Sequence, residues 1–146
     1  MFKLLTIGWT GSTGIEMILF DISDPTNLSG KHSVQIGESG TWSDVLPDHR
    51  VLLFSKERNM LAFPVAIDEG MHITFRGAII YEFDLEEGFT RRGEITHLQE
   101  DENPESTFTE WLNRIIYIDD IFITISSGMI KSTDINTMQT VDSLEF

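Results

Sequence analysis

One strand-forming unit occurs three times along this chain, and this repeat constrains the fold more than any other feature. In each copy an apolar run ends in Asp and continues into a polar turn. The copies lie at residues 18–22, 80–85 and 129–135. The Asp of the first copy, Asp21, precedes Asp84 by 63 positions, and Asp84 precedes Asp134 by 50 positions. Each copy follows one hydrophobic strand and precedes another, so the repeated unit is a group of short antiparallel strands.

Strand periodicity dominates the rest of the chain. Short runs rich in Ile, Leu, Phe and Val recur between Gly, Asp, Pro and Asn residues, and no long stretch shows helical spacing. Residues 107–112 are the one place where a single helical turn is expected. The sequence predicts eleven strands, at residues 3–8, 16–22, 31–36, 50–55, 60–67, 78–85, 90–98, 114–118, 121–126, 129–133 and 141–146.

Groups of four antiparallel strands at this spacing are typical of propeller blades, since kelch repeats run about 50 residues and WD repeats about 40–45. The sequence therefore predicts an all-β fold, a partial β-propeller of about three blades, with the first blade lacking its inner strand. The blades span approximately residues 1–36, 43–98 and 111–146, within a single domain of residues 1–146. The alternative is one β-sandwich, which would show no internal repeat. Closed propellers have about four to eight blades, so we expect a homo-oligomer, for example two chains completing one ring.

The charge balance argues against two classes of partner. The 146 residues include 24 Asp and Glu against 10 Lys and Arg, which gives a net charge of −14. Nucleic acids and anionic membranes attract basic surfaces, so neither is an expected partner. No apolar run approaches the roughly 18 residues of a membrane span. The chain has no Cys, which excludes disulfides and thiolate metal sites.

Several segments resemble a known family in their order and spacing. These segments are residues 17–27, 36–40, 48–54, 92–98 and 117–146. The chain resembles the β-propeller domain found near the C-terminus of secreted archaeal and bacterial proteins, which is distantly related to WD-type repeats. The resemblance implies a propeller fold and an extracytoplasmic setting, and it implies no particular activity. The apolar part of residues 1–9 is too short for a signal peptide, and the family's other blades are missing, so a fragment of a longer secreted propeller is an alternative.

Catalytic and metal-binding motifs are scarce. There is no Gly-x-Ser-x-Gly elbow, phosphate-binding loop or zinc-binding helix. Asp48 and His49 could form an acid–base pair, but neighbours in a strand point to opposite faces, so a structural hydrogen-bonding role is favoured. The histidines are too scattered for a metal triad. No cofactor is predicted. Calcium is the one alternative, at Asp119 and Asp120 or in the acidic loop at residues 99–106, although solvated turns explain both segments equally well.

The expected topology brings the longer connections to one face of the propeller. These connections are residues 9–15, 37–49, 68–77, 99–113 and 127–128. All three tryptophans lie in them, and loops on a rigid scaffold often carry binding residues. The candidate binding face comprises Trp9, Trp42, Asp48, His49, His72 and Trp111. In the alternative, each Trp plugs a blade end or a seam between blades.

The sequence therefore favours a binding or interaction module for a protein, small molecule or glycan, with no evident catalytic activity. A carboxylate-dependent hydrolase is a less favoured alternative. It would require two carboxylates about 5–10 Å apart across a cleft on the loop face.

Overall fold

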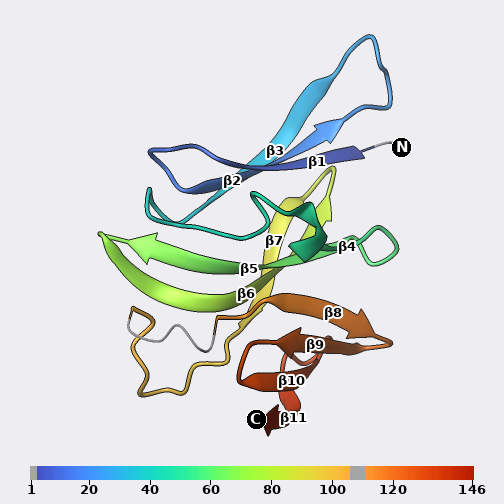
Figure 1. Ribbon diagram of the computed structural model, residues 1–146. Coiled ribbons are helices and arrows are strands. Elements are labelled where there is room, and N and C mark those ends of the chain that lie inside the picture. Colours follow the sequence, from blue (N-terminus) through green and yellow to red (C-terminus); the bar gives the residue numbers. More distant parts are fainter. Residues whose placement is uncertain (1–2, 106–110) are drawn as a thin grey trace.

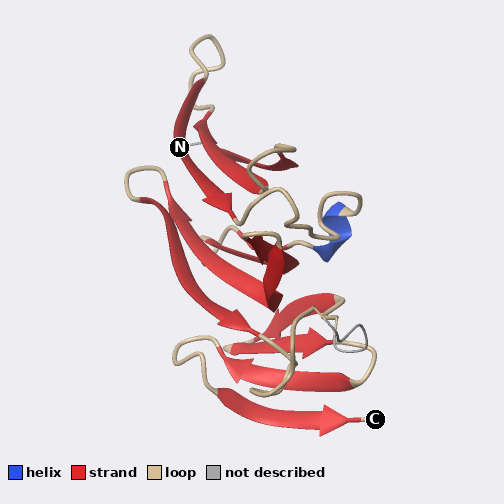
Figure 2. Cartoon of the chain, turned by 90° about the vertical axis from the view of Figure 1, so that its left-hand side faces the viewer, coloured by secondary structure: helices blue, strands red, loops and turns tan. Residues whose placement is uncertain are grey.

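Eleven strands form three antiparallel sheets in the computed structural model, which describes residues 3–105 and 111–146 (Figure 1). Blade 1 contains β1 (Lys3–Trp9), β2 (Ile15–Asp21) and β3 (Ser29–Ile36), in the order β1-β2-β3. Blade 2 contains β4 (Leu53–Ser55), β5 (Met60–Glu69), β6 (His72–Asp84) and β7 (Gly88–Ile95), also in chain order. Blade 3 contains β8 (Arg114–Ile118), β9 (Ile121–Ile125), β10 (Met129–Asp134) and β11 (Thr140–Glu145). The three blades lie one upon another in chain order (Figure 2).

The repeated Asp residues occupy equivalent places in the three blades. Asp21, Asp84 and Asp134 are the last residues of β2, β6 and β10. In each case one carboxylate oxygen accepts the backbone N–H two residues further on, at 2.9, 2.7 and 2.8 Å. An Asp that caps its own turn in this way is a common turn-forming device. The sequence repeat is therefore a turn that ends the next-to-last strand of each blade, and blade 1 lacks the counterpart of β4 and β8.

Hydrogen bonds within these turns lower the pKa of all three carboxyls, because they favour the ionised form. For Asp21 the main cause is the bond with the Ser23 side chain. For Asp84 and Asp134 it is the backbone N–H of Glu87 and of Thr137, respectively.

Blade 2 is buried on both faces. Along β5, successive side chains point to opposite faces, and all residues from Met60 to Asp68 are buried. Leu61, Phe63 and Val65 pack against blade 1 in one hydrophobic layer. Met60 and Ala62 pack against blade 3 in a second layer. A strand that is apolar on both faces is typical of sheets covered on both sides.

Two local predictions were wrong. Residues 50–55 do not form one strand, because His49–Val51 form a short 3-10 helix with Asp48 at its N-cap, and β4 begins only at Leu53. Residues 68–77 do not form a loop, because β5 and β6 continue to a tight hairpin. Gly70 and Met71 at its tip have φ of 66° and 65°, the left-handed values that a two-residue type I′ turn requires. The helical turn expected at residues 107–112 falls largely outside the described residues.

Candidate binding surface at the loop end

Connections from all three blades meet at one end of the sheets, which we call the loop end. Trp9 Nε1 donates to the Ser39 carbonyl oxygen at 3.4 Å and so joins the β1–β2 connection to the β3–β4 connection. Glu38 Oε2 accepts the Gly70 N–H at 2.8 Å, which ties the β3–β4 connection to the tip of the β5–β6 hairpin. The hairpin is in turn bonded to the segment that follows β7, because His72 Nδ1 lies 3.1 Å from Glu105 Oε1. Hydrogen bonds therefore link the connections at this end from blade 1 to the segment that follows blade 2 (Figure 1).

Trp9 and Trp42 are exposed at the loop end, with 53% and 44% of their surface accessible. Trp111 differs from them, since it is half-buried and the Arg76 guanidinium lies over its ring at 5.0 Å from the centroid. Arg76 belongs to β6, whereas Trp111 lies just before β8, so this cation–π contact joins blades 2 and 3. Two of the three tryptophans thus present their rings to solvent, and the third lies in a seam between blades.

The position of Trp42 follows from the way its segment pairs with the edge of β5. The Trp42 N–H donates to the Ala66 carbonyl oxygen at 3.0 Å, and the Ala66 N–H donates to the Trp42 carbonyl oxygen at 2.8 Å. Beside this pair, the Asp68 N–H donates to Thr41 Oγ1 at 3.0 Å. The Ser43 hydroxyl donates to the Pro64 carbonyl oxygen. Because Pro64 has no N–H, backbone pairing is interrupted there, and a side chain makes the contact instead.

Asp48 and His49 do not belong to this surface. Their segment runs along β5 away from the loop end and carries both residues towards β4 (Figure 1). The Asp48 carboxylate accepts from the Arg50 backbone N–H at 3.0 Å and forms an ion pair with Arg50 Nε at 2.8 Å. The hydrogen bond from the Arg50 side chain is the main reason why the pKa of the Asp48 carboxyl is lowered to about 2. Asp48 therefore caps a 3-10 helix, which is the structural hydrogen-bonding role that the sequence favoured over acid–base chemistry.

His72 lies at the loop end as predicted. Its Nδ1 and the Ile73 N–H both approach Glu105 Oε1, each at 3.1 Å. The His72 and Glu105 side chains are 74% and 43% exposed, and a contact between polar side chains as exposed as these contributes little to stability. Its role here is to position the segment after β7 beside the hairpin.

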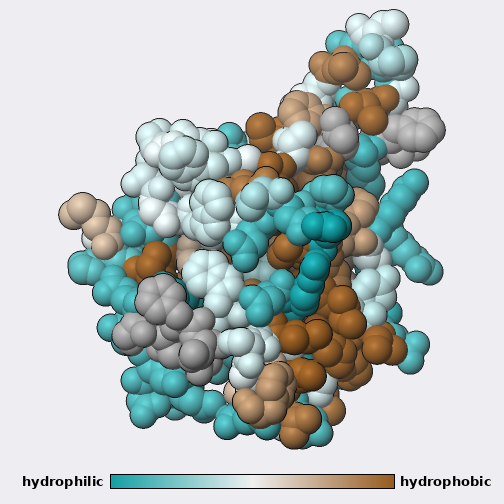
Figure 3. Space-filling model, in the orientation of Figure 1, coloured by the Kyte–Doolittle hydropathy of each residue, from teal (hydrophilic) through white to brown (hydrophobic). Residues whose placement is uncertain are grey.

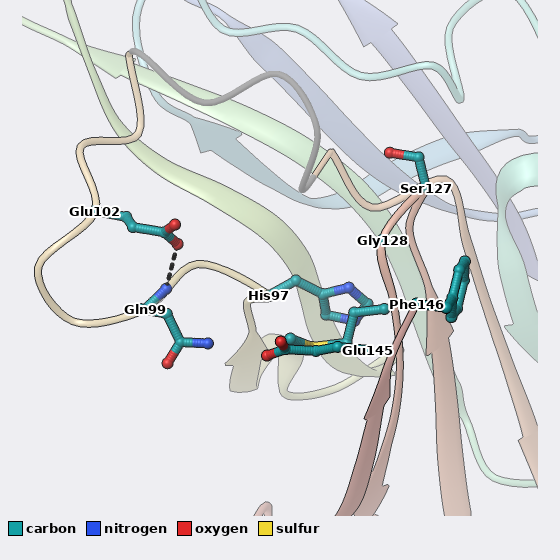
Figure 4. A pocket seen from close by; sticks show the side chains of 8 residues that line it. His97, Gln99, Glu102, Ser127, Gly128, Glu145 and Phe146 are labelled. Atoms are coloured by element: carbon teal, nitrogen blue, oxygen red, sulfur yellow. Dashed lines mark hydrogen bonds between the residues drawn. The ribbon is translucent and has the colours of Figure 1, made fainter.

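A pocket of about 560 Å³ opens between the segment after β7 and the β9–β10 turn (Figure 4). The residues that line it are His97, Gln99, Glu102, Ser127, Gly128, Met129, Glu145 and Phe146. The buried His97 ring lies between two hydroxyls of blade 3, with Nδ1 at 2.8 Å from Ser126 Oγ and Nε2 at 2.8 Å from Thr124 Oγ1. Glu102 is held by the Gln99 N–H, which donates to its Oε2 at 2.7 Å.

Sequence reasoning missed this pocket. The sequence places Glu145 and Phe146 some 40 positions from Glu102. They come together because β11 runs back beside β10, which puts Glu145 opposite Met129. No local motif signals that register.

Acidic groups do not form an evident metal site. Among residues 3–105 and 111–146, no group of three or more His, Asp or Glu side chains is arranged to hold a metal ion. At the β8–β9 turn, Arg58 Nη2 donates to Asp120 Oδ1 at 2.8 Å and to the Asp119 carbonyl oxygen at 2.9 Å. The Asp119 carbonyl and one oxygen of the Asp120 carboxylate therefore bind a guanidinium, which joins blades 2 and 3. In the described part of the chain, no helix is long and apolar enough to span a membrane.

Three antiparallel sheets, stacked in chain order and ended by the same Asp turn, define the class of protein as a β-propeller type. The sequence model of the family described as the beta propeller domain matches residues 3–138, and the chain belongs to that family. No curated protein matches the chain.

Proposed function

We propose that this chain is an interaction module that binds its partner at the loop end. The observation that carries the proposal is that connections from the successive blades are hydrogen-bonded together there while Trp9 and Trp42 stay exposed. A rigid scaffold that presents exposed aromatic rings is well suited to binding, because Trp offers a large contact area at low entropic cost.

The charge of the loop end supports a neutral or basic partner. Glu38, Glu102 and Glu105 lie in its connections, and Glu145 lines the pocket beside them. These carboxylates would repel anionic ligands and attract Lys or Arg side chains. They can also accept hydrogen bonds from sugar hydroxyls while a Trp ring packs on the sugar. A basic protein segment or a neutral glycan is therefore the partner class we propose.

Binding to arrays of neutral oligosaccharides and of basic peptides tests this function. We expect specific binding in one array, and we expect Trp9→Ala with Trp42→Ala to weaken it at least about tenfold, as truncation of aromatic hot spots does. Phe54→Ala is the matched control, since Phe54 is a comparably exposed aromatic residue on β4. Unchanged binding by the double variant, or no binding in either array, would contradict the proposal.

A further inference from the structure

Blade 3 has an apolar face that nothing in the described chain covers. Side chains alternate along β8 and β9, so Ile115, Tyr117 and Phe122 face blade 2, whereas their neighbours face away from it. The strand register extends the uncovered set across β10 and β11. We call this set the outer isoleucine face, and it comprises Ile116, Ile118, Ile121, Ile123, Ile125, Ile130 and Leu144. Hydrophobic side chains gather in this region at the lower right of Figure 3.

On β8 and β9 the outer face has the composition of a covered surface, whereas on β10 and β11 the same face also carries Ser132 and Asp142. When one side of an antiparallel sheet faces water, its residues are usually polar. Here Ile118 and Leu144 are 60% and 64% exposed, and every residue of the set is at least partly exposed.

The repeat identifies what covers the same position elsewhere in the chain. Met17, Ile80 and Ile130 each lie four residues before the repeated Asp, so they are equivalent positions of β2, β6 and β10. Met17 and Ile80 have no exposed surface because the following blade packs on them, whereas Ile130 is 37% exposed. Within the chain, these equivalent positions are covered by the following blade, through the face that it turns towards the blade before it. A face of that kind therefore fits the outer isoleucine face.

Blade 1 has such a face free. In β2 the buried Met17 and Leu19 point towards blade 2, so Ile18 and Phe20 point away from it. Together with Glu16, Gly30, Lys31, His32 and Ser33, they line a shallow hollow of about 360 Å³. Ile18 is equivalent to Tyr81 of blade 2, because each lies three residues before the repeated Asp, and Tyr81 is buried against blade 1. The outer faces of blades 3 and 1 are therefore equivalent to the two surfaces that meet wherever one blade packs on the next within the chain.

We propose that the outer isoleucine face of blade 3 binds the outer face of blade 1 in a second copy of this chain, forming a closed twofold dimer with two such contacts. Because blade 1 has three strands and the strands of blade 3 are about five residues long, each contact measures roughly 16 by 14 Å, or about 230 Å². Two contacts, each burying both surfaces, would remove roughly 900 Å² from water, which is at the low end of interface sizes and typical of weak association. The arrangement is head-to-tail, and the twofold closure leaves neither face open.

Sedimentation equilibrium of the full chain at 1–100 µM, roughly the range over which interfaces of this size associate, tests the dimer. We expect twice the 16.6 kDa chain mass. Ile116→Lys with Ile118→Lys should weaken the dimer at least about 100-fold, because it places unpaired charges in both contacts. Met71→Lys, an equally drastic change at the exposed hairpin tip, should leave the mass unchanged. A monomeric wild type, or a dimeric double variant, would overturn the proposal.

Cross-linking tests which faces meet. Because the chain has no Cys, Ile18→Cys and Ile130→Cys each introduce a single thiol. A short bismaleimide should link the two variants when they are mixed and should link neither variant to itself. Efficient cross-linking of Ile130→Cys alone would show that two blade 3 faces meet each other, which would overturn the head-to-tail arrangement. Circular dichroism of each variant establishes that it is folded.

Discussion

Blade 2 and blade 3 are built from the same kind of strand but differ in how many of their faces are covered. β5 is buried on both sides by its neighbours, whereas β8 alternates between the buried Ile115 and the exposed Ile116 and Ile118. Both strands have apolar residues at nearly every position. The hydrophobic pattern of a strand therefore shows that both faces of its blade can be buried. Which faces are buried depends on the neighbouring blades.

Truncation of a large side chain should distinguish the blades most strongly. Phe63 is fully buried between blades 1 and 2, so Phe63→Ala should destabilise the fold by about 3–5 kcal/mol through lost burial and a residual cavity. Ile118→Ala on the outer face of blade 3 should cost no more than about 0.5 kcal/mol in the monomer, as surface changes usually do. Urea denaturation at pH 7, at concentrations where the protein is monomeric, measures both. Equal losses would show that the outer face is covered within the chain.

Glycine substitutions should give the next largest difference. A Cβ added at Gly77 in β6 would lie 2.2 Å from the Ile95 carbonyl oxygen and 2.8 Å from the Phe75 ring. Overpacking of this kind costs about 1–3 kcal/mol, so we expect Gly77→Ala to destabilise blade 2 by that amount.

The matched control is Gly128→Ala at the β9–β10 turn, where an added Cβ meets nothing within 4 Å. We expect it to be neutral or slightly stabilising, because Ala restricts the unfolded chain more than Gly does. Thermal unfolding of the two variants measures the difference. If Gly128→Ala destabilised as much as Gly77→Ala, blade 3 would be packed as tightly at this edge as blade 2.

The fold was predicted correctly where apolar residues recur with the regular spacing of strands. The eleven strands and their grouping followed from apolar runs with regular spacing and from the repeated Asp. The hairpin at Gly70 and Met71 was missed because the polar residues near its tip were interpreted as a loop, although 72–76 still alternate between polar and apolar types. The 3-10 helix was missed because Asp48 was considered as a partner for His49 and as a structural hydrogen-bonding residue beside a strand, and not as a helix cap.

The candidate site was harder to predict from the sequence. Its location followed from strand direction, so Trp9, Trp42 and His72 were placed at the loop end by topology alone. Asp48 and His49 lie away from the loop end because of the way residues 37–48 pair with the edge of β5 around Pro64. The pocket forms because of the register between β10 and β11. Both are tertiary features with no short-range signal.

The smallest expected effect concerns the turns, where blades 2 and 3 should behave alike. Asp84 is exposed and Asp134 is half-buried, and both have lowered pKa values, caused mainly by the Glu87 and Thr137 N–H groups. A carboxyl whose pKa is lower in the folded than in the unfolded chain stabilises the fold fully above about pH 4, its unfolded value, and loses that contribution as the pH falls below it. Asp84→Asn and Asp134→Asn should each slightly lower the urea midpoint at pH 7, because a neutral amide accepts the turn N–H groups less strongly. Each variant should also lose less stability than the wild type between pH 4 and pH 2.5. A clear difference between the two variants would mean that the covered blade supports its turn more than the open blade does, so the contrast between the blades would extend beyond their faces.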